Sequence, residues 1–330
     1  MNLIFRKVLI TGSSGFIGQE LCNFFLKKDH KVFGLDKTRP KHLSRITFFK
    51  CDIMNKEHLL KVLREINPEL IIHLAARADL KSSNLNYYKE NFIGTKNIID
   101  SANLVPVIKR VIFTSTLLVN KIGTNIDGKF TFYNPDTKYG ESKVLMERII
   151  KSSSCKFEWC IIRPTTIWGD NIQNHFKSLL NLMQKKIYFH IGQKKIFKSY
   201  GYIKNSVFQI YKLAYAKKNL FNNKIYYISD YENIELREWT NKISGLLTGK
   251  DVMITLPVFL AKFLAKIGDF LLIFGFEKFP IQSYRLNNIL VSFKVDTKTI
   301  KKICGKLPYN SDEAILSFVN SYKLKKFINS

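Results

Sequence analysis

The sequence predicts an α/β protein in which a doubly wound parallel sheet is followed by a smaller C-terminal domain. In the first half of the 330 residues, short apolar segments alternate with segments of helical periodicity. The apolar segments run without polar interruptions, as expected of parallel strands that are covered on both faces. The alternation loosens after Pro164, so the first domain is expected to end near residue 165.

The expected strands lie at residues 7–11, 31–36, 46–52, 70–75, 110–115 and 158–163. The expected helices between them lie at residues 16–28, 56–66, 88–102 and 139–151. Right-handed crossovers then place helices on both faces of the sheet. A further strand is expected at 225–229, so the C-terminal region would be partly interleaved with this sheet.

The first predicted strand-to-helix turn carries three glycines. Gly12, Gly15 and Gly18 lie three residues apart, between an apolar run ending at Thr11 and a helix beginning at Phe16. Gly12 permits the tight turn, Gly15 lets the backbone approach a pyrophosphate, and Gly18 lets the helix pack close to the strand. N–H groups at the helix N-terminus favour a doubly charged phosphate pair. The turn therefore predicts a dinucleotide-binding site.

Asp36 follows the second predicted strand, about twenty residues beyond the glycines. A carboxylate at this spacing binds the ribose hydroxyls of adenosine and repels a 2′-phosphate, so we expect NAD rather than NADP. Lys37 and Arg39 come directly after it and could hold such a phosphate, which leaves NADP open as an alternative.

Composition limits the class of protein. Hydrophobic residues make up 46% of the chain and charged residues 24%, as in globular proteins. The net charge of +27 is spread along the chain without a nucleic-acid motif, so we expect a lysine-rich surface and no nucleic-acid partner. The five cysteines show no metal-ligand spacing, and the first strand begins too early to leave room for a signal peptide. We therefore expect no metal and a cytoplasmic location.

Residues 255–276 form an apolar segment of helical periodicity. Lys262, Lys266 and Asp269 interrupt it, so no uncharged run reaches the roughly 18 to 20 residues of a transmembrane helix. Its large apolar residues, Phe259 among them, recur on one face. We expect that face to contact the protein core or another subunit, and a helix lying in a membrane interface is the alternative.

Tyr139 and Lys143 lie four residues apart in the helix that follows the fifth strand, so they share one helix face. The ordinary pKa of a tyrosine, near 10, is too high for a base at neutral pH. We expect the lysine and an oxidised nicotinamide ring to lower it, so that Tyr139 exchanges a proton with a sugar hydroxyl during hydride transfer. Thr116, at the end of the fifth strand, is the candidate for a hydrogen bond to the reacting oxygen.

With these residues, the chain resembles the extended short-chain dehydrogenase/reductase family, in its NAD-dependent sugar epimerase/dehydratase group. Besides the segment 11–18, the likeness rests on His73-Leu74-Ala75-Ala76, on Asn91 with Gly94-Thr95, and on Arg163-Pro164. It implies a Rossmann domain at 1–165 that binds NAD, a substrate-binding region at 166–330, and a homodimer.

The resemblance also implies the site residues. The catalytic residues are Thr116, Tyr139 and Lys143. The cofactor contacts are Gly12, Gly15, Phe16, Ile17, Gly18, Asp36, Asp52, Ile53, Leu74, Ala75, Ala76, Asn91, Thr114, Ser115, Tyr139, Lys143 and Pro164.

Two departures from the family pattern narrow the reaction. The 4,6-dehydratases of the family follow the catalytic Thr with Asp-Glu, whereas Leu117-Leu118 follow Thr116 here and neither can act as an acid or base. The reductases that also epimerise neighbouring carbons carry a Cys near this position, and this chain has none there. We therefore expect a nucleotide-sugar epimerase or keto-reductase. The 198–205 stretch, and Phe279-Pro280-Ile281 with Arg285, resemble a subgroup associated with surface-polysaccharide sugars.

Substrate contacts are expected from cationic and polar residues beside the predicted cleft. The candidates for a diphosphate or nucleotide are Arg77, Lys81, Asn174, His175, Lys198 and Arg285. Two alternative functions stay open. A dehydrogenase of a lipid- or steroid-like alcohol is suggested by the apolar 255–276 segment. The second is a non-catalytic protein that binds NAD as a scaffold. The presence of all three residues Thr116, Tyr139 and Lys143 argues against it.

Overall fold

The computed structural model describes residues 5–39, 45–124, 130–170, 174–252, 254–274 and 282–328. The chain divides into two compact units, and both are discontinuous in sequence. The first unit comprises residues 1–167, 201–231 and 296–308. The second comprises residues 168–200, 232–295 and 309–330.

The first unit is built on a parallel sheet to which the described residues contribute seven strands, in the order β11-β6-β5-β4-β1-β2-β3. The strands are β1 (Lys7–Thr11), β2 (Lys31–Asp36), β3 (Thr47–Lys50), β4 (Leu70–His73), β5 (Arg110–Thr114), β6 (Glu158–Pro164) and β11 (Lys224–Ile228). The strand order reverses between β1 and β4, and ligands of such sheets bind at this switch point, beyond the carboxyl ends of the strands. The predicted doubly wound sheet is thereby confirmed.

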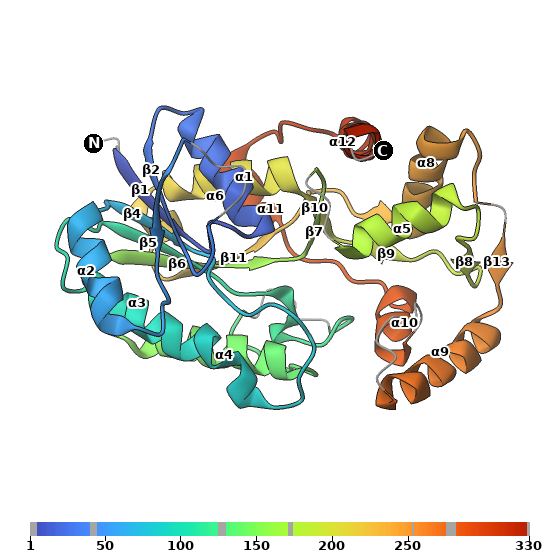
Figure 1. The fold of residues 1–330 in the computed structure, drawn as a ribbon, viewed down its shortest axis with the longest axis horizontal. Coiled ribbons are helices and arrows are strands. Elements are labelled where there is room, and N and C mark those ends of the chain that lie inside the picture. Colours follow the sequence, from blue (N-terminus) through green and yellow to red (C-terminus); the bar gives the residue numbers. More distant parts are fainter. Residues whose placement is uncertain are drawn as a thin grey trace. The chain divides into compact units, whose positions relative to one another are not determined.

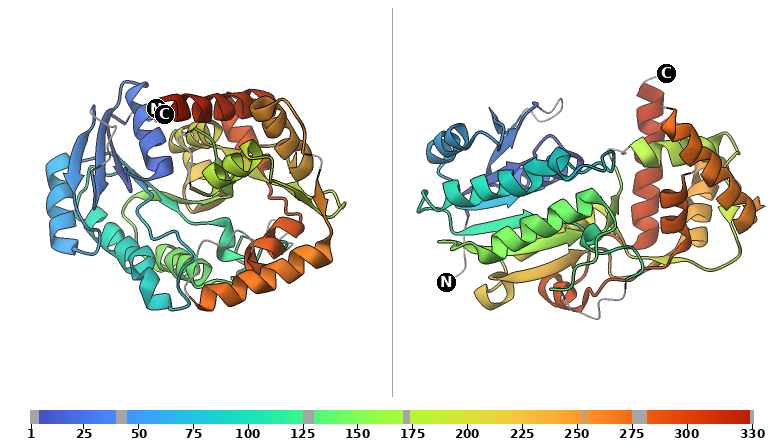
Figure 2. Two further views of the ribbon diagram at one scale, coloured as in Figure 1. Left: turned by 45° about the vertical axis from the view of Figure 1, so that its right-hand side comes forward. Right: turned by 90° about the horizontal axis from the view of Figure 1, so that it is seen from below.

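Helices cover both faces of this sheet, as Figures 1 and 2 show. One face carries α2 (Lys56–Ile66), α3 (Thr95–Ala102) and α4 (Lys138–Ser152). The other carries α1 (Phe16–Leu26), α6 (Ile203–Ala214) and α11 (Lys298–Cys304), and the short helix α7 (Lys218–Phe221) precedes β11. All four residues of β4 are buried, which explains why the strand sequences are continuously apolar.

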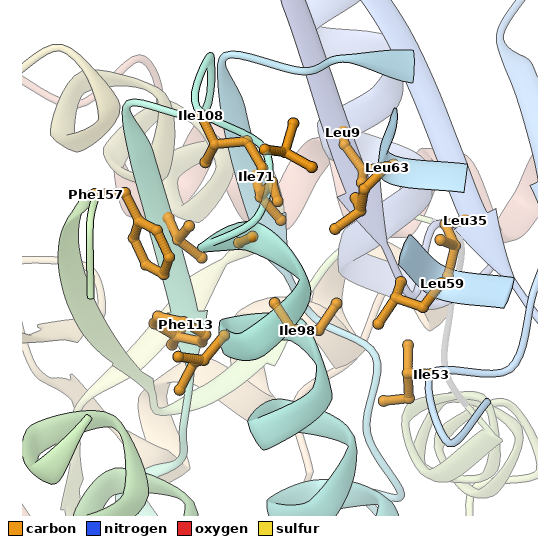
Figure 3. Close-up of a cluster of buried hydrophobic side chains, with 14 of the residues drawn as sticks. Leu9, Leu35, Ile53, Leu59, Leu63, Ile71, Ile98, Ile108, Phe113 and Phe157 are labelled. Carbon is orange, nitrogen blue, oxygen red and sulfur yellow. The ribbon is translucent and has the colours of Figure 1, made fainter. Parts of the chain in front are cut away.

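The hydrophobic core of the first unit lies between the sheet and α2 and α3 (Figure 3). Leu9 and Ile71 from the sheet meet Leu63 of α2 and Ile98 of α3, and all four side chains are fully buried. Burial of each such side chain contributes about 1.5–3 kcal/mol. This core fixes the strands whose ends carry the predicted site.

The predicted helix at 88–102 is three shorter pieces. A 3₁₀ turn at Leu85–Tyr88 is followed by a π-helical turn at Glu90–Gly94 and then by α3. A Cβ atom on Gly94 would lie 2.4 Å from the Cδ1 atom of Ile53, so the turn sits tightly against the segment after β3. The widened turn buries Asn91, and such turns occur frequently at functional sites.

The second unit contains α5 (Asn174–Gln184), α8 (Leu236–Thr248), α9 (Val258–Ile273), α10 (Ser283–Leu290) and α12 (Ser311–Ile328). Short strands pair as β8 (His190–Ile191) with β13 (Thr255–Leu256), and as β9 (Phe197–Lys198) with β12 (Ile234–Glu235). Two further strands, β7 (Thr166–Trp168) and β10 (Tyr200–Tyr202), pair where the chain passes between the two units. Its core is aromatic: Trp168 packs edge to face on Trp239 and Phe318, with ring centroids 5.2 and 5.5 Å apart.

The predicted contact of the apolar α9 face with the protein core is wrong. The side chains of Phe259, Phe263 and Phe270 are 76%, 61% and 59% exposed. The opposite face is the buried one, because Ala261 and Ala265 pack against α10 and their small side chains let the two helices approach closely. None of the helices among the described residues is long and apolar enough to cross a membrane.

Candidate active site

The glycine turn between β1 and α1 has the geometry of an anion site. Gly12 has a φ of +69°, and a Cβ atom there would lie 2.7 Å from the backbone nitrogen of Ala75. A Cβ atom on Gly18 would lie 2.2 Å from the carbonyl oxygen of Gly12, so only glycine lets α1 approach β1 this closely. At Gly15, a Cβ would meet the Gly12 carbonyl oxygen at 3.2 Å and, apart from its chain neighbours and its own helix, no other atom of the described residues within 4 Å, so the space above the turn is open.

The N-terminus of α1 is left available to a ligand. Gly15 is its N-cap and has no side chain to cap the helix, and the first turn carries no acidic residue. The N–H groups of this turn, including those of Phe16 and Ile17, then point toward the open space with the positive end of the helix dipole. This arrangement fits the pyrophosphate of a dinucleotide.

Asp36 ends β2 beside this turn. Its Oδ2 atom accepts the backbone N–H of Ser14 at 3.1 Å, and its Oδ1 atom accepts that of Lys37 at 2.7 Å. The ammonium group of Lys37 lies 3.1 Å from Asp52 and 3.7 Å from Glu90. Its charge is therefore opposed by two carboxylates, which disfavours the 2′-phosphate contact that NADP would require.

The remaining predicted cofactor residues gather at the same edge of the sheet. Asp52 and Ile53 follow β3, residues 74–76 follow β4, Thr114 ends β5 with Ser115 directly after it, and Pro164 ends β6. Since all these strands are parallel, their carboxyl ends meet at one edge. The hydroxyl of Thr114 is buried and has no hydrogen-bond partner among the described residues. It is therefore able to form a hydrogen bond with a ligand.

Asn91 holds two segments of this edge together. Its Oδ1 atom accepts the backbone N–H of Arg77 at 2.7 Å, and its Nδ2 atom donates to the carbonyl of Arg77 and to the hydroxyl of Ser142, both at 2.9 Å. The amide is therefore engaged by the protein on both sides. Asn91 positions the loop after β4 against α4, and its predicted contact with the cofactor stays a prediction.

Thr116 and Tyr139 come together although 22 residues separate them along the helix-and-loop connection. Thr116 caps a 3₁₀ turn at Leu117–Val119, where its hydroxyl accepts the N–H of Leu118 at 3.2 Å. Tyr139 lies in the first turn of α4, and its phenol lies close enough to the Thr116 side chain for that hydroxyl to lower the phenol pKa. A reacting oxygen placed against the phenol would therefore also be within reach of Thr116.

The first turn of α4 is fixed by two neighbouring residues. Thr137 is its N-cap and accepts the backbone N–H of Gly140 at 3.0 Å. A Cβ atom on Gly140 would lie 2.2 Å from the carbonyl oxygen of Leu118, so only glycine allows this approach. Gly140 was not singled out by sequence reasoning. It brings the 3₁₀ turn that begins after Thr116 against the start of α4.

Burial shifts the pKa values of Tyr139 and Lys143 in opposite directions. It raises the pKa of Tyr139 to about 12, against the lowering effect of the nearby Thr116 side chain. It lowers the pKa of Lys143 to about 7, and the carboxylate of Glu147 opposes this shift. Lys143 is not among the groups that shift the phenol pKa without NAD, and the expected lowering with bound NAD stays a prediction. The ammonium group of Lys143 instead donates to the carbonyl of Thr114 at 2.8 Å.

Glu147, one turn beyond Lys143 on α4, is a site residue that sequence reasoning missed. Its side chain is fully buried and forms an ion pair of 2.8 Å with Arg163, which is also fully buried. It accepts the hydroxyl of Ser115 at 2.6 Å and that of Tyr133 at 2.8 Å. Its place at helical spacing from Tyr139 and Lys143 was the available signal.

His73 supports the site as a neutral residue. Its two ring nitrogens contact the hydroxyls of Thr11, at 2.7 Å, and Thr95, at 3.2 Å. Burial and the charge of Lys143 lower the pKa of His73 to about 3. The ring therefore stays uncharged and ties β1 and β4 to α3. Among the described residues, no group of three or more His, Cys, Asp or Glu could hold a metal ion.

The two candidate substrate-binding residues of the first unit, Arg77 and Lys81, differ in how firmly their side chains are held. Arg77 pairs with Glu90 at 2.9 Å and lies 4.3 Å above the ring of Tyr87. Lys81 is exposed, and within the described part of the chain its backbone N–H is held by Asp79 at 3.1 Å. Lys81 therefore presents its ammonium group to solvent, whereas Arg77 is held in place.

Lys198 is a structural contact within the second unit. Its side chain is buried, and its ammonium group donates to the carbonyls of Asn288 and Val291, at 2.5 Å each. Burial lowers its pKa to about 8. These contacts tie β9 to the end of α10, and they leave its predicted diphosphate contact without support.

Of the other candidate substrate-binding residues in the C-terminal half, the structure describes the side chain of one. Arg285 is exposed on α10. Asn174 and His175 begin α5, and their side chains lie outside the described part of the structure. The segment 279–281 also lies outside it.

Comparison with known proteins identifies relatives of this chain. Residues 8–220 match the model of the NAD dependent epimerase/dehydratase family. The chain is 28% identical over 276 residues to UDP-glucose 4-epimerase from Vibrio cholerae, an alignment that covers 79% of this chain and 82% of the relative. It is 24% identical over 313 residues to N-acetyl-alpha-D-glucosaminyl-diphospho-ditrans,octacis-undecaprenol 4-epimerase from Escherichia coli O157:H7, covering 93% of this chain and 92% of the relative.

The fold is shared with solved structures. UDP-glucose 4-epimerase from Thermotoga maritima, solved with UDP-glucose, matches with a TM-score of 0.73 at 18% identity, covering 97% of this chain and 99% of that one. At this identity the match establishes the fold and not the reaction.

Proposed function

This chain belongs to the NAD-dependent epimerase/dehydratase family, and from that premise we propose that it inverts or reduces a hexose ring carbon of a nucleotide-linked sugar. The observation that carries the proposal is the proximity of the Thr116 and Tyr139 side chains, set at the carboxyl ends of the strands with Lys143 one turn away. It supports hydride transfer coupled to proton exchange at one oxygen.

NAD is the cofactor, and the residues around the glycine turn fit it. The N–H groups at the start of α1 would hold its pyrophosphate, Asp36 its adenosine ribose, and Lys143 its nicotinamide ribose. When bound, NAD supplies the hydride acceptor and a positive ring charge. Lowering the phenol pKa from about 12 to near 7 takes on the order of 7 kcal/mol in favour of the phenolate. Since the ammonium group of Lys143 donates to the carbonyl of Thr114, we infer that bound NAD contributes to that stabilisation.

The proton route follows from the pair of hydroxyls. The Oη atom of Tyr139 accepts the proton of the sugar hydroxyl as the ring carbon is oxidised, and Thr116 orients that oxygen. The same phenol returns the proton when the ketone is reduced. Leu117 and Leu118 follow Thr116 and carry no acid or base, so the proposal does not include dehydration.

The second unit is proposed to bind the sugar and its diphosphate. Of the candidates in this unit, Arg285 presents an exposed cationic group. The relatives named UDP-glucose 4-epimerase support a nucleoside diphosphate as the carrier of the sugar. A homodimer through paired helices and a role in making surface-polysaccharide sugars remain predictions.

A second candidate substrate is a hexose joined through a diphosphate to a polyprenyl lipid. The relative from Escherichia coli that covers most of this chain is named for such a substrate, and the exposed apolar side of α9 is compatible with it. A dehydrogenase of a lipid- or steroid-like alcohol would use the same Thr116, Tyr139 and Lys143 and remains a prediction.

One experiment separates these substrates. Purified protein is incubated with panels of nucleotide-linked hexoses, polyprenyl-diphosphate-linked hexoses and steroid alcohols, each with and without added NADH. Inversion without net change of cofactor supports an epimerase, and stoichiometric loss of NADH supports a reductase. Turnover confined to the steroid alcohols, or no turnover of any sugar, would overturn the proposal.

A further inference from the structure

One side of α9 is exposed and apolar to a degree that the family's reaction does not require. Phe259, Phe263, Ile267, Phe270 and Phe274, the last just beyond the helix, are between 37% and 76% exposed. At 3.6 residues per turn they fall within roughly 100° of the helix circumference. We call this surface the phenylalanine stripe. Soluble surfaces rarely expose large apolar groups in such a contiguous row.

The phenylalanine stripe stays exposed because the opposite side of α9 packs against α10. Ala261 and Ala265 on the opposite side of α9 are fully buried against Leu286 of α10. Asp269 accepts the backbone N–H of Ser283, the first residue of α10, at 3.0 Å. Figure 2 shows α9 and α10 side by side. Because the small residues form the internal contact, rotation of α9 to bury the phenylalanines would separate the two helices.

Cationic residues border the stripe. Lys262 and Lys266 are exposed on the turn of α9 next to the phenylalanines. Lys194 and Lys195 are exposed two and three residues after Gly192, and a Cβ atom on Gly192 would lie 2.7 Å from the Cγ2 atom of Val258. These lysines therefore lie near the beginning of α9. The only acidic residue of α9, Asp269, is half-buried and held by α10.

We propose that α9 docks this protein on the surface of an anionic phospholipid bilayer. The phenylalanine stripe enters the boundary between headgroups and acyl chains, with the helix axis in the plane of the membrane. The bordering lysines extend their ammonium groups to the lipid phosphates. The net charge of +27 adds a long-range attraction to the same surface. The inference does not depend on which substrate the active site takes.

The charges also argue against a second copy as the occupant. In a two-fold symmetric dimer, the same patch of both chains meets itself. The lysines at 262 and 266 of one chain would then approach those of the other. An anionic bilayer offers the opposite charge at the same position, so the chemistry of the border favours lipid.

Vesicle flotation tests the proposal on the full-length protein. Vesicles of phosphatidylcholine with about one-third phosphatidylglycerol are expected to bind the protein, and pure phosphatidylcholine is expected to bind it at least tenfold less. The double variant F263E/F270E should lose at least tenfold in binding to the anionic vesicles. The control Leu104→Glu removes a similarly exposed apolar residue, 53% exposed in the first unit, and should bind like the wild type.

A second measurement keeps the test independent of folding and self-association. The variant Phe263→Trp should shift its fluorescence to the blue when anionic vesicles are added, whereas the native Trp159, Trp168 and Trp239 are buried. NAD binding of F263E/F270E should equal that of the wild type, because the dinucleotide residues lie in the first unit. Wild-type protein that fails to bind anionic vesicles, or variant protein that binds them fully, would overturn the proposal. A wild-type dimer that F263E/F270E converts to a monomer, without vesicle binding, would assign the stripe to a second copy instead.

Discussion

Glu147 and Arg163 form an ion pair in which both side chains are completely buried, with the Nε and one terminal nitrogen of the guanidinium each 2.8 Å from a different carboxylate oxygen. The carboxylate also accepts the hydroxyl of Ser115, the residue just before Thr116. The pair therefore links α4, which carries Tyr139 and Lys143, to the ends of β5 and β6. It couples the stability of the fold to the geometry of the reacting groups.

Glu147→Gln should both destabilise the protein and change its pH profile. Breaking a buried pair leaves an uncompensated charge, here on Arg163, which costs about 3–5 kcal/mol. The Glu147 carboxylate raises the pKa of Lys143, so its loss lowers that pKa further below the ordinary lysine value. Lys143 then loses its proton at lower pH, and the fall in activity on the alkaline side should begin at lower pH. Urea unfolding and a kcat/KM profile measure the two effects.

The matched control for this variant is Glu158→Gln. Glu158 pairs with the buried Arg110 at 2.8 Å, at the opposite ends of the same strands. It should cost less stability, because the Glu158 side chain is partly exposed, whereas that of Glu147 is fully buried. Its pH profile should match the wild type. An E147Q profile identical to that of E158Q would show that Glu147 has no influence on Lys143.

Tyr139→Phe should remove turnover and leave cofactor binding nearly intact. The phenol is the proposed acid and base, and loss of such a group costs about 10²–10⁴-fold in rate. NAD binding, measured by calorimetry, should change less than about twofold, since the ring is retained. Tyr88→Phe is the control, because Tyr88 is a buried phenol with its ring 6.1 Å from that of Tyr139. Turnover in Y139F equal to that in Y88F would refute the assignment.

Lys143→Met should change how stability depends on pH. Burial lowers the pKa of Lys143 to about 7 in the folded protein, against about 10.4 in an unfolded chain. Between these values the unfolded state binds more protons, so the free energy of unfolding contributed by this group rises with pH. K143M has no titrating group at this position, so its stability does not gain from this rise. The difference in unfolding free energy, K143M minus wild type, should therefore fall as pH rises from 7 to 10. Urea unfolding at three pH values without NAD follows the difference, and a constant difference would contradict the depressed pKa.

Asp36→Ser should shift the cofactor preference toward NADP. The carboxylate is placed to bind two ribose hydroxyls and to repel a 2′-phosphate. Its loss should weaken NAD binding about tenfold and bring NADP binding closer to that of NAD, as calorimetry with each coenzyme would measure. Asp29→Asn removes a carboxylate from the surface turn after α1 and should leave both affinities unchanged. An unchanged ratio in D36S would assign the preference to another residue.

The sheet and the cofactor edge were predictable because their signals are local. The glycine turn, Asp36 and the apolar strands each follow from short-range spacing, and the parallel order brings the strand ends together. For the apolar side of α9, the predicted contact with the core was wrong and the predicted contact with another subunit is untested, since hydrophobicity alone does not say what covers such a face. The contact with α10 depends instead on the small size of Ala261 and Ala265. Long-range partners such as Glu147 and Arg163 carry no local mark of their pairing.

Gly140 is a further residue whose importance only the fold reveals. A Cβ atom there would lie 2.2 Å from the carbonyl oxygen of Leu118, so Gly140→Ala should push the start of α4 away from the turn after Thr116. Overpacking of this kind costs about 1–3 kcal/mol, and the separation of Tyr139 from Thr116 should lower kcat at least tenfold. Gly245→Ala in α8 is the matched control, because its Cβ would meet only the Asp251 side chain, at an ordinary 3.6 Å. G245A should keep full activity and gain up to about 1 kcal/mol from helix propensity. If G140A retained wild-type kcat, the contact between the hydroxyls of Thr116 and Tyr139 would not depend on this close approach.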